Sequence, residues 1–236
     1  MRFPHPLLRG TLVRRYKRFM ADVVLDGGEA VVAHCANSGS MLAVADPGSE
    51  VWLSPALAPS RKLRYTWEMV RVGGALVGIN TSLPNVLVAE AVAAGRIPEL
   101  AGYDSSRREV GYGTGSRIDL LLEGAGRPRC YVEVKNVTLR RGTGPAFPAE
   151  FPDAVTARGT KHLHELAAMV GAGHRAVMVY LVQRADCDRM AIAADIDPVY
   201  DAALKDAVAK GVETLCYSCT LDVDGIMVDR RLPIGQ

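Results

Sequence analysis

The stretch from residue 116 to residue 136 constrains the fold of this chain more than any other. It reads SRIDLLLE, GAGRP and RCYVEVKN, and two apolar segments around a turn cluster predict a β-hairpin. If residues 124–128 form a five-residue loop, Asp119 lies directly opposite Glu133, with Cβ atoms about 5 Å apart. Side chains alternate along a strand, so Glu133 and Lys135 lie on the same face. The sequence therefore predicts that two carboxylates and one ammonium group lie together.

These three groups fit a metal site better than a purely structural role. Two facing carboxylates repel each other, and half-buried charges lose hydration that one lysine restores only in part. A divalent cation that prefers hard oxygen ligands, Mg²⁺ or Mn²⁺, would relieve the repulsion and could activate a water molecule. We predict that Asp119 and Glu133 are metal ligands and catalytic residues, and that Lys135 is a catalytic residue that positions the attacking water. The alternative is a surface hairpin with one solvated ion pair.

Four segments of the chain are distinctive: RID at 117–119, YVEVKNVTL at 131–139, FPDAVT at 151–156 and RGTKHL at 158–163. Together they resemble the sugar fermentation stimulation protein A family, and the resemblance covers essentially the whole chain. The pattern of Asp119 and the later Glu-x-Lys is also similar to the PD-(D/E)XK nuclease superfamily, although Ile118 stands where that name has proline.

The resemblance implies a mixed α/β protein with two domains. Residues 1–82 would form an OB-fold-like β-barrel that binds nucleic acid, and residues 83–236 a PD-(D/E)XK nuclease-like α/β domain. The implied function is that of a DNA-binding protein with a divalent-metal-dependent nuclease (phosphodiesterase) site, linked by family to regulation of sugar (maltose) utilisation. The alternative is a non-catalytic, nonspecific DNA-binding transcriptional regulator of sugar metabolism. RNA stays open as a substrate, and so does the oligomeric state, for which a homodimer is one option.

The amino-terminal residues independently favour a small barrel. Candidate strands near residues 11–25, 30–35, 50–53, 65–72 and 75–80 are separated by turn residues such as Asp-Gly-Gly and Asp-Pro-Gly. About five strands in some seventy residues suit a closed barrel such as an OB-fold.

Basic and aromatic residues interleave in the same region. Residues 1–80 contain ten Lys and Arg and six Asp and Glu, whereas the rest of the chain contains 18 and 20. Cationic side chains can follow phosphates while aromatic faces stack bases, but an aromatic core with a solvated outer face gives the same pattern. The family resemblance favours nucleic-acid binding, and the predicted binding residues are Arg14, Arg15, Lys17, Arg18, Arg61, Lys62 and Arg64.

The composition changes near Asn80, and Pro84 then opens a predicted helix over 86–94. In nuclease folds of the type that the chain resembles, a glutamate on the first helix often reaches the metal, so Glu90 is a further candidate metal ligand. Glu109, ahead of the hairpin, competes for this role.

A second helix is predicted over 156–170, and its polar side could hold phosphate through Arg158 and Lys161. His162 and His164 point in different directions on this helix, so they do not suggest a zinc pair. A strand over 175–183, a helix over 197–210 and a hairpin over 212–232 complete the predicted α/β core.

Composition narrows the class further. The 236 residues are 49% hydrophobic with a net charge of +2, so affinity for nucleic acid must come from local clusters. The five cysteines are scattered and odd in number, which favours a reducing compartment. The longest apolar run, residues 176–182, is too short to span a bilayer. We therefore expect a cytoplasmic protein without a membrane partner.

Overall fold

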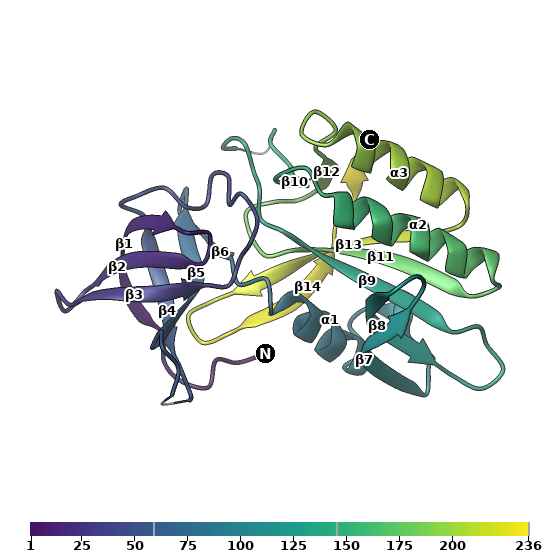
Figure 1. Cartoon of the computed structure of the whole chain (residues 1–236), viewed down its shortest axis with the longest axis horizontal. Helices are drawn as coiled ribbons and strands as arrows, with labels where there is room; N and C mark the ends of the chain where they lie inside the picture. Colours follow the sequence, from purple (N-terminus) through teal and green to yellow (C-terminus); the bar gives the residue numbers. More distant parts are fainter. Residues whose placement is uncertain (59, 145, 236) are drawn as a thin grey trace.

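The amino-terminal part of the chain forms a closed β-barrel in the computed structural model, which describes residues 1–58, 60–144 and 146–235 (Figure 1). Its strands are β1 (Leu8–Tyr16), β2 (Met20–Leu25), β3 (Ala30–Cys35), β4 (Glu50–Pro55), β5 (Tyr65–Val72) and β6 (Ala75–Gly78). They follow the order β3-β2-β1-β4-β5-β6, and a parallel pairing of β3 with β5 closes the barrel. Alternate side chains such as Leu12, Val23 and Trp67 fill its interior. The predicted barrel is confirmed.

One predicted strand of the barrel is wrong. Residues 11–25 form parts of two strands, because the chain reverses between β1 and β2. Lys17 and Arg18 make this turn with left-handed backbone angles, φ 46° and 63°. The turn contains no Gly, Pro, Asn or Asp, so the sequence carried no turn signal at this point.

The rest of the chain forms a sheet with helices on both faces, at the right of Figure 1. Its helices are α1 (Pro84–Ala93), η1 (Pro98–Leu100), α2 (Ala157–Gly171) and α3 (Pro198–Ala209). The main sheet has the order β14-β13-β11-β9-β8-β7, with strands β7 (Ser105–Tyr112), β8 (Ser116–Glu123), β9 (Cys130–Val137), β11 (Arg175–Val182), β13 (Glu213–Leu221) and β14 (Ile226–Arg231). A small second sheet contains β10 (Ala149–Phe151), β12 (Met190–Ile192) and β15 (Ile234–Gly235).

Parallel pairing of β9, β11 and β13 sets the layers of this domain. The crossovers α2 and α3 cover one face of the sheet and α1 covers the other, which buries β11 on both sides. Strand β7 was not predicted, because its exposed sequence SSRREVGY lacks apolar alternation at the edge of the sheet. The short strands β10, β12 and β15 were not predicted either. The predicted mixed α/β core is confirmed.

The barrel and the α/β domain are joined by backbone pairing and by a fixed linker. Gly78 N donates to Gln183 O at 2.9 Å and Val77 bridges to Arg184, so the end of β6 pairs with the residues that follow β11. Asn80, which follows, donates to the buried Glu68 Oε2 at 2.7 Å. On the other side, Met41 N donates to Asp153 Oδ2 at 3.0 Å. The two domains therefore hold a defined groove between them.

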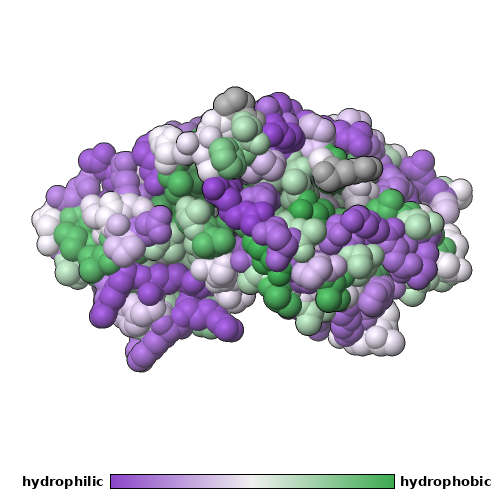
Figure 2. Space-filling model, turned by 90° about the horizontal axis from the view of Figure 1, so that it is seen from above, coloured by the Kyte–Doolittle hydropathy of each residue, from purple (hydrophilic) through white to green (hydrophobic). Residues whose placement is uncertain are grey.

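The surface is mixed in character. Seen from above, hydrophilic and hydrophobic side chains are interspersed over both domains (Figure 2). Within residues 1–58, 60–144 and 146–235, no helix has both the length and the apolar character needed to cross a membrane.

Candidate active site

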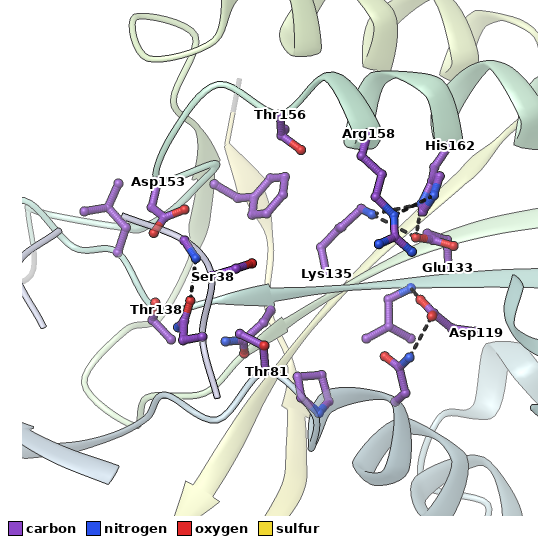
Figure 3. Close-up of a pocket in the computed structure, with 18 of the residues that line it drawn as sticks. Ser38, Thr81, Asp119, Glu133, Lys135, Thr138, Asp153, Thr156, Arg158 and His162 are labelled. Carbon is purple, nitrogen blue, oxygen red and sulfur yellow. Dashed lines mark hydrogen bonds and ion pairs between the residues drawn. The ribbon is translucent and has the colours of Figure 1, made fainter. Parts of the chain in front are cut away.

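A groove of about 320 Å³ lies between the barrel and the α/β domain. The barrel supplies Asn37, Ser38 and Gly39, and the linker supplies Thr81. The α/β domain supplies, among others, Asn85, Asp119, Glu133, Lys135, Asp153, Thr156, Arg158 and His162 (Figure 3). The structure thus brings the three hairpin residues Asp119, Glu133 and Lys135 together in one hollow.

The hairpin register places the two carboxylates. Leu120 pairs with Val132, Leu121 with Tyr131 and Leu122 with Cys130, which confirms the predicted register. Continued by one residue, this register sets Asp119 opposite Glu133. The ladder stops there because Val134 N donates to the Asp119 side chain, to Oδ2 at 2.7 Å.

Asp119 is fixed from two directions. Besides the amide of Val134, the Asn85 side chain donates from Nδ2 to Asp119 Oδ1 at 2.6 Å. Asn85 lies at the start of α1, so this helix orients the carboxylate with its first turn. The same Nδ2 lies 3.3 Å from Glu109 Oε1, which brings the competing candidate Glu109 close to Asp119.

Glu133 is the centre of a second cluster, drawn in Figure 3. Only 2% of this residue is exposed. Its Oε1 accepts from Lys135 Nζ at 2.8 Å and from His162 Nδ1, while Lys135 Nζ also lies 3.2 Å from that nitrogen. Arg158 Nε donates to the other ring nitrogen, Nε2, at 3.4 Å. This pattern assigns the proton of the His162 ring to Nδ1 and makes Nε2 an acceptor.

Burial and neighbouring charges act in opposite ways on the two carboxylates. Burial, followed by the charge of Glu133, raises the pKa of Asp119 to about 6. Burial also acts to raise the pKa of Glu133, but the hydrogen bond from His162 and the charge of Lys135 outweigh it, so this pKa is lowered. The anionic form of Glu133 is thus stabilised, whereas the anionic form of Asp119 is destabilised by burial and by the charge of Glu133.

This donor set fits a hard divalent cation. Glu133 Oε2 is buried and has no hydrogen-bond partner among the described residues, and the second carboxylate lies next to it in the register. In the described part of the chain no three His, Cys, Asp or Glu side chains are gathered as a full ligand set. Mg²⁺ commonly binds through one or two carboxylates and completes its shell with water and substrate phosphate. Asp119 and Glu133 are the residues that would hold the ion.

The structure does not bring Glu90 to this groove. Its carboxylate is 49% exposed and lies 2.7 Å from the amino-terminal nitrogen of Met1, in a separate hollow. The first turn of α1 faces the groove through Pro84 and Asn85, and Glu90 projects from the other end of the helix. The prediction of Glu90 as a ligand is not supported by this geometry.

The predicted basic residues of the barrel serve different purposes. Arg14 pairs with Asp22 at 2.7 Å. Arg15 donates to the carbonyl oxygens of Asn37 and Gly39 at 2.9 and 3.0 Å, so it braces the barrel loop that lines the groove. Lys17 and Arg18 are exposed in the β1–β2 turn, and Arg18 lines a second hollow that adjoins the groove at Ser38, Gly39 and Asp153.

Of the remaining predicted basic residues, one lines the groove and the others lie elsewhere. Arg158 is exposed and lines the groove. Lys161 donates to Thr114 O at 3.3 Å and lies 3.6 Å from Glu165, so it helps to fasten the β7–β8 turn to α2. Arg61, Lys62 and Arg64 are exposed in the β4–β5 connection, which Figure 1 shows at the lower left, away from α2.

Sequence reasoning missed three contributors to the site. The sequence places His162 on the polar side of the second helix, four residues after Arg158, but we predicted no role for it in the site once the zinc pair with His164 was set aside. The shared helix face with Arg158 was the useful signal. Asn85 looked like part of a linker. No local pattern linked the barrel loop at Asn37 to the hairpin, because domain docking creates that contact.

Fold and site together define a two-domain protein in which an OB-type barrel and an α/β domain enclose an acidic groove. Comparison with known proteins identifies the family. The model for the sugar fermentation stimulation protein RE domain matches residues 82–225, and the model for the SfsA N-terminal OB domain matches residues 13–79. The chain belongs to the sugar fermentation stimulation protein family.

Relatives support this over the full length. A sugar fermentation stimulation protein homolog of Rhodospirillum rubrum is 61% identical over 242 residues, covering 99% of both chains. One from Paramagnetospirillum magneticum is 65% identical over 226 residues, covering 96% of this chain and 94% of the relative. A solved structure of Pyrococcus furiosus SfsA in complex with Ca²⁺ is 26% identical, with a TM-score of 0.89, covering 100% of this chain and 98% of the other.

Proposed function

We propose that this protein is a divalent-metal-dependent phosphodiesterase that acts on DNA. The observation that carries the proposal is the facing pair of carboxylates, the half-buried Asp119 and the buried Glu133, beside Lys135 in a groove. The raised pKa of Asp119 and the unpartnered buried oxygen of Glu133 show that this pair destabilises the fold when nothing else is bound. The Ca²⁺ in the Pyrococcus furiosus relative supports a divalent cation, because Ca²⁺, Mg²⁺ and Mn²⁺ all favour oxygen ligands.

A divalent cation in this site would supply a bound water of lowered pKa and would neutralise charge that develops on a phosphate. Lys135 Nζ, held 2.8 Å from Glu133 Oε1, can donate a further hydrogen bond to the attacking water and orient it toward phosphorus. His162 fixes the same carboxylate oxygen from α2. Arg158 presents a guanidinium group to the groove, where it can bind a substrate phosphate.

The direct test is incubation of the purified protein with labelled single- and double-stranded DNA and RNA, with Mn²⁺ or with a chelator. We expect cleavage of DNA with Mn²⁺ and none with the chelator. DNA binding without any cleavage would favour the alternative, a nonspecific DNA-binding regulator of sugar metabolism. Cleavage of RNA and not of DNA would show a phosphodiesterase whose substrate is RNA.

Substrate binding should depend on the basic residues beside the groove and not on every basic residue of the barrel. We expect Arg18→Ala and Arg158→Ala to weaken DNA binding and to lower the slope of log affinity against log salt by about 0.9 for each lost duplex-phosphate contact. Fluorescence anisotropy at several salt concentrations measures both quantities.

Arg64→Ala is the matched control for these variants, because it removes an exposed arginine from the β4–β5 connection. Its affinity and salt slope should equal those of the wild type. An effect as large as that of Arg18→Ala would extend the binding surface to that side of the barrel, as the sequence pattern predicted.

A further inference from the structure

Four buried side-chain oxygen atoms lack a hydrogen-bond partner in the described part of the chain. One, Gln183 Oε1, lies against Gly78 at the junction with the barrel. The other three are the Tyr112 hydroxyl, Glu133 Oε2 and Glu165 Oε2. The three residues are only 8%, 2% and 7% exposed. Buried polar atoms nearly always have partners, so three exceptions on one face of the sheet call for a physical explanation.

The elements around Glu133 place the three residues on the face of the sheet that α2 covers. Glu165 follows His162, whose ring contacts Glu133, by almost one turn of α2. Its other oxygen, Oε1, accepts from Thr114 N and Thr114 Oγ1, both at 3.2 Å. A Cβ atom on Gly113 would lie 3.0 Å from the same Oε1. Glu165 therefore lies directly over the turn that follows Tyr112.

Tyr112 reaches the cluster across the sheet. Its ring centroid lies 5.7 Å from that of Tyr131, which is on β9 two residues before Glu133 and on the same face. Burial, and then the charges of Glu133 and Glu165, raise the pKa of the Tyr112 hydroxyl well above its usual range. The hydroxyl therefore stays protonated and is available as a donor.

One water molecule could supply the missing hydrogen-bond partners of all three atoms. A water donates two hydrogen bonds, which the two carboxylate oxygens can accept, and it accepts one from the tyrosine hydroxyl. A cation in the same place would leave the hydroxyl proton without an acceptor. Glu133 Oε2 has two lone pairs, so it can accept from this water and still ligate a metal.

We propose that Tyr112 and Glu165 hold one ordered water against Glu133 Oε2, and that Tyr112 is thereby a positioning residue for this carboxylate. The effect on metal affinity rests on the proposed function, in which Glu133 is a metal ligand. Groups that hydrogen-bond to metal ligands commonly change metal affinity by 10- to 100-fold.

Tyr112→Phe removes the hydroxyl and keeps the ring against Tyr131. Calorimetry with Mn²⁺ should show a dissociation constant raised by about tenfold. The matched control is Tyr217→Phe, which removes a hydroxyl that donates to Glu99 Oε2 at 2.5 Å on the opposite face of the sheet. Its Mn²⁺ affinity should be that of the wild type.

Glu165→Gln adds a test of the shared water. It keeps an oxygen for Thr114 but can replace the acceptor Oε2 with a donor, so it should also weaken Mn²⁺ binding. Combined with Tyr112→Phe it should add little, because either change alone removes the water. Fully additive effects would overturn the shared water.

The outcomes separate the two proposals. If the wild type binds Mn²⁺ and Tyr112→Phe binds it equally well, the positioning role is overturned and the proposed function stands. If the wild type binds no Mn²⁺, the proposed function fails. A crystal structure of the metal-free protein then still tests whether Tyr112, Glu133 and Glu165 share an ordered water. An ordered water within hydrogen-bond distance of all three oxygen atoms supports the shared water, and direct contact of Tyr112 with a carboxylate in place of a water overturns it.

Discussion

Asp119→Asn should abolish detectable Mn²⁺ binding and metal-dependent cleavage. The substitution keeps the shape of the side chain, and its oxygen can still accept from Val134 N, but it removes one of the two anionic ligands. Loss of a group that only supports a ligand costs 10- to 100-fold, so loss of the ligand itself should cost at least about 100-fold in affinity. Calorimetry with Mn²⁺ and a cleavage assay measure the two effects.

The same substitution should stabilise the metal-free protein. The pKa of Asp119 is raised from 3.8 to about 6, so the folded state binds this proton more tightly than the unfolded state does. Stability is therefore lost as the pH rises from about 4 to about 6, and the loss is complete at pH 7. A shift of this size corresponds to at most about 3 kcal/mol. The gain is smaller by about 1 kcal/mol, because the new amide nitrogen cannot accept the hydrogen bond from Asn85 Nδ2.

Denaturant unfolding with a chelator at pH 5 and pH 7 checks this sign. The free energy of unfolding of Asp119→Asn should be higher than that of the wild type at both pH values, and the difference should be larger at pH 7 than at pH 5. Glu123→Gln is the control on the same hairpin, because Glu123 is paired with Arg107 and Arg129 and has no carboxylate opposite it in the register. That variant should lose up to about 1 kcal/mol. Unchanged Mn²⁺ affinity in Asp119→Asn would show that Asp119 is not a ligand.

The hairpin was predictable because strand register depends on local sequence. Alternation and a five-residue loop are enough to set Asp119 opposite Glu133, and the observed pairs agree. Arg15 and Arg18 both line the hollow beside the groove. Interleaved charge alone could not show that Arg18 is exposed there while Arg15 donates to carbonyl oxygens of its own domain. That distinction depends on the path of a distant loop.

Glu90 shows that the sequence can predict a helix without showing which of its side chains reaches the site. The sequence predicted α1 within two residues of its observed bounds, but a helix with little amphipathic contrast does not specify which end approaches the hairpin. Packing on the sheet turns Asn85 toward Asp119 and Glu90 toward Met1. Tertiary contacts, and not the helix itself, thus select the side chain that reaches the carboxylate.

Lys135→Ala should separate binding from chemistry. An ammonium group does not ligate a hard cation, so the variant should keep its affinity for Mn²⁺ and for DNA. Glu133 Oε1 would still accept from His162 Nδ1, which keeps that carboxylate in place. Cleavage should fall by about 10²- to 10⁴-fold, the usual contribution of a group that assists proton transfer.

Single-turnover cleavage at saturating Mn²⁺ measures this loss, and anisotropy with uncleaved DNA measures binding. Lys205→Ala is the matched control, because it removes a lysine of α3 that pairs with Asp201 at 2.7 Å and does not line the groove. It should cleave at a rate near that of the wild type. If Lys135→Ala loses Mn²⁺ affinity together with cleavage, its positive charge serves to hold the two carboxylates together. If it cleaves at the wild-type rate, another group positions the water, and His162 is then the nearest candidate because its Nδ1 lies 3.2 Å from the position of Lys135 Nζ.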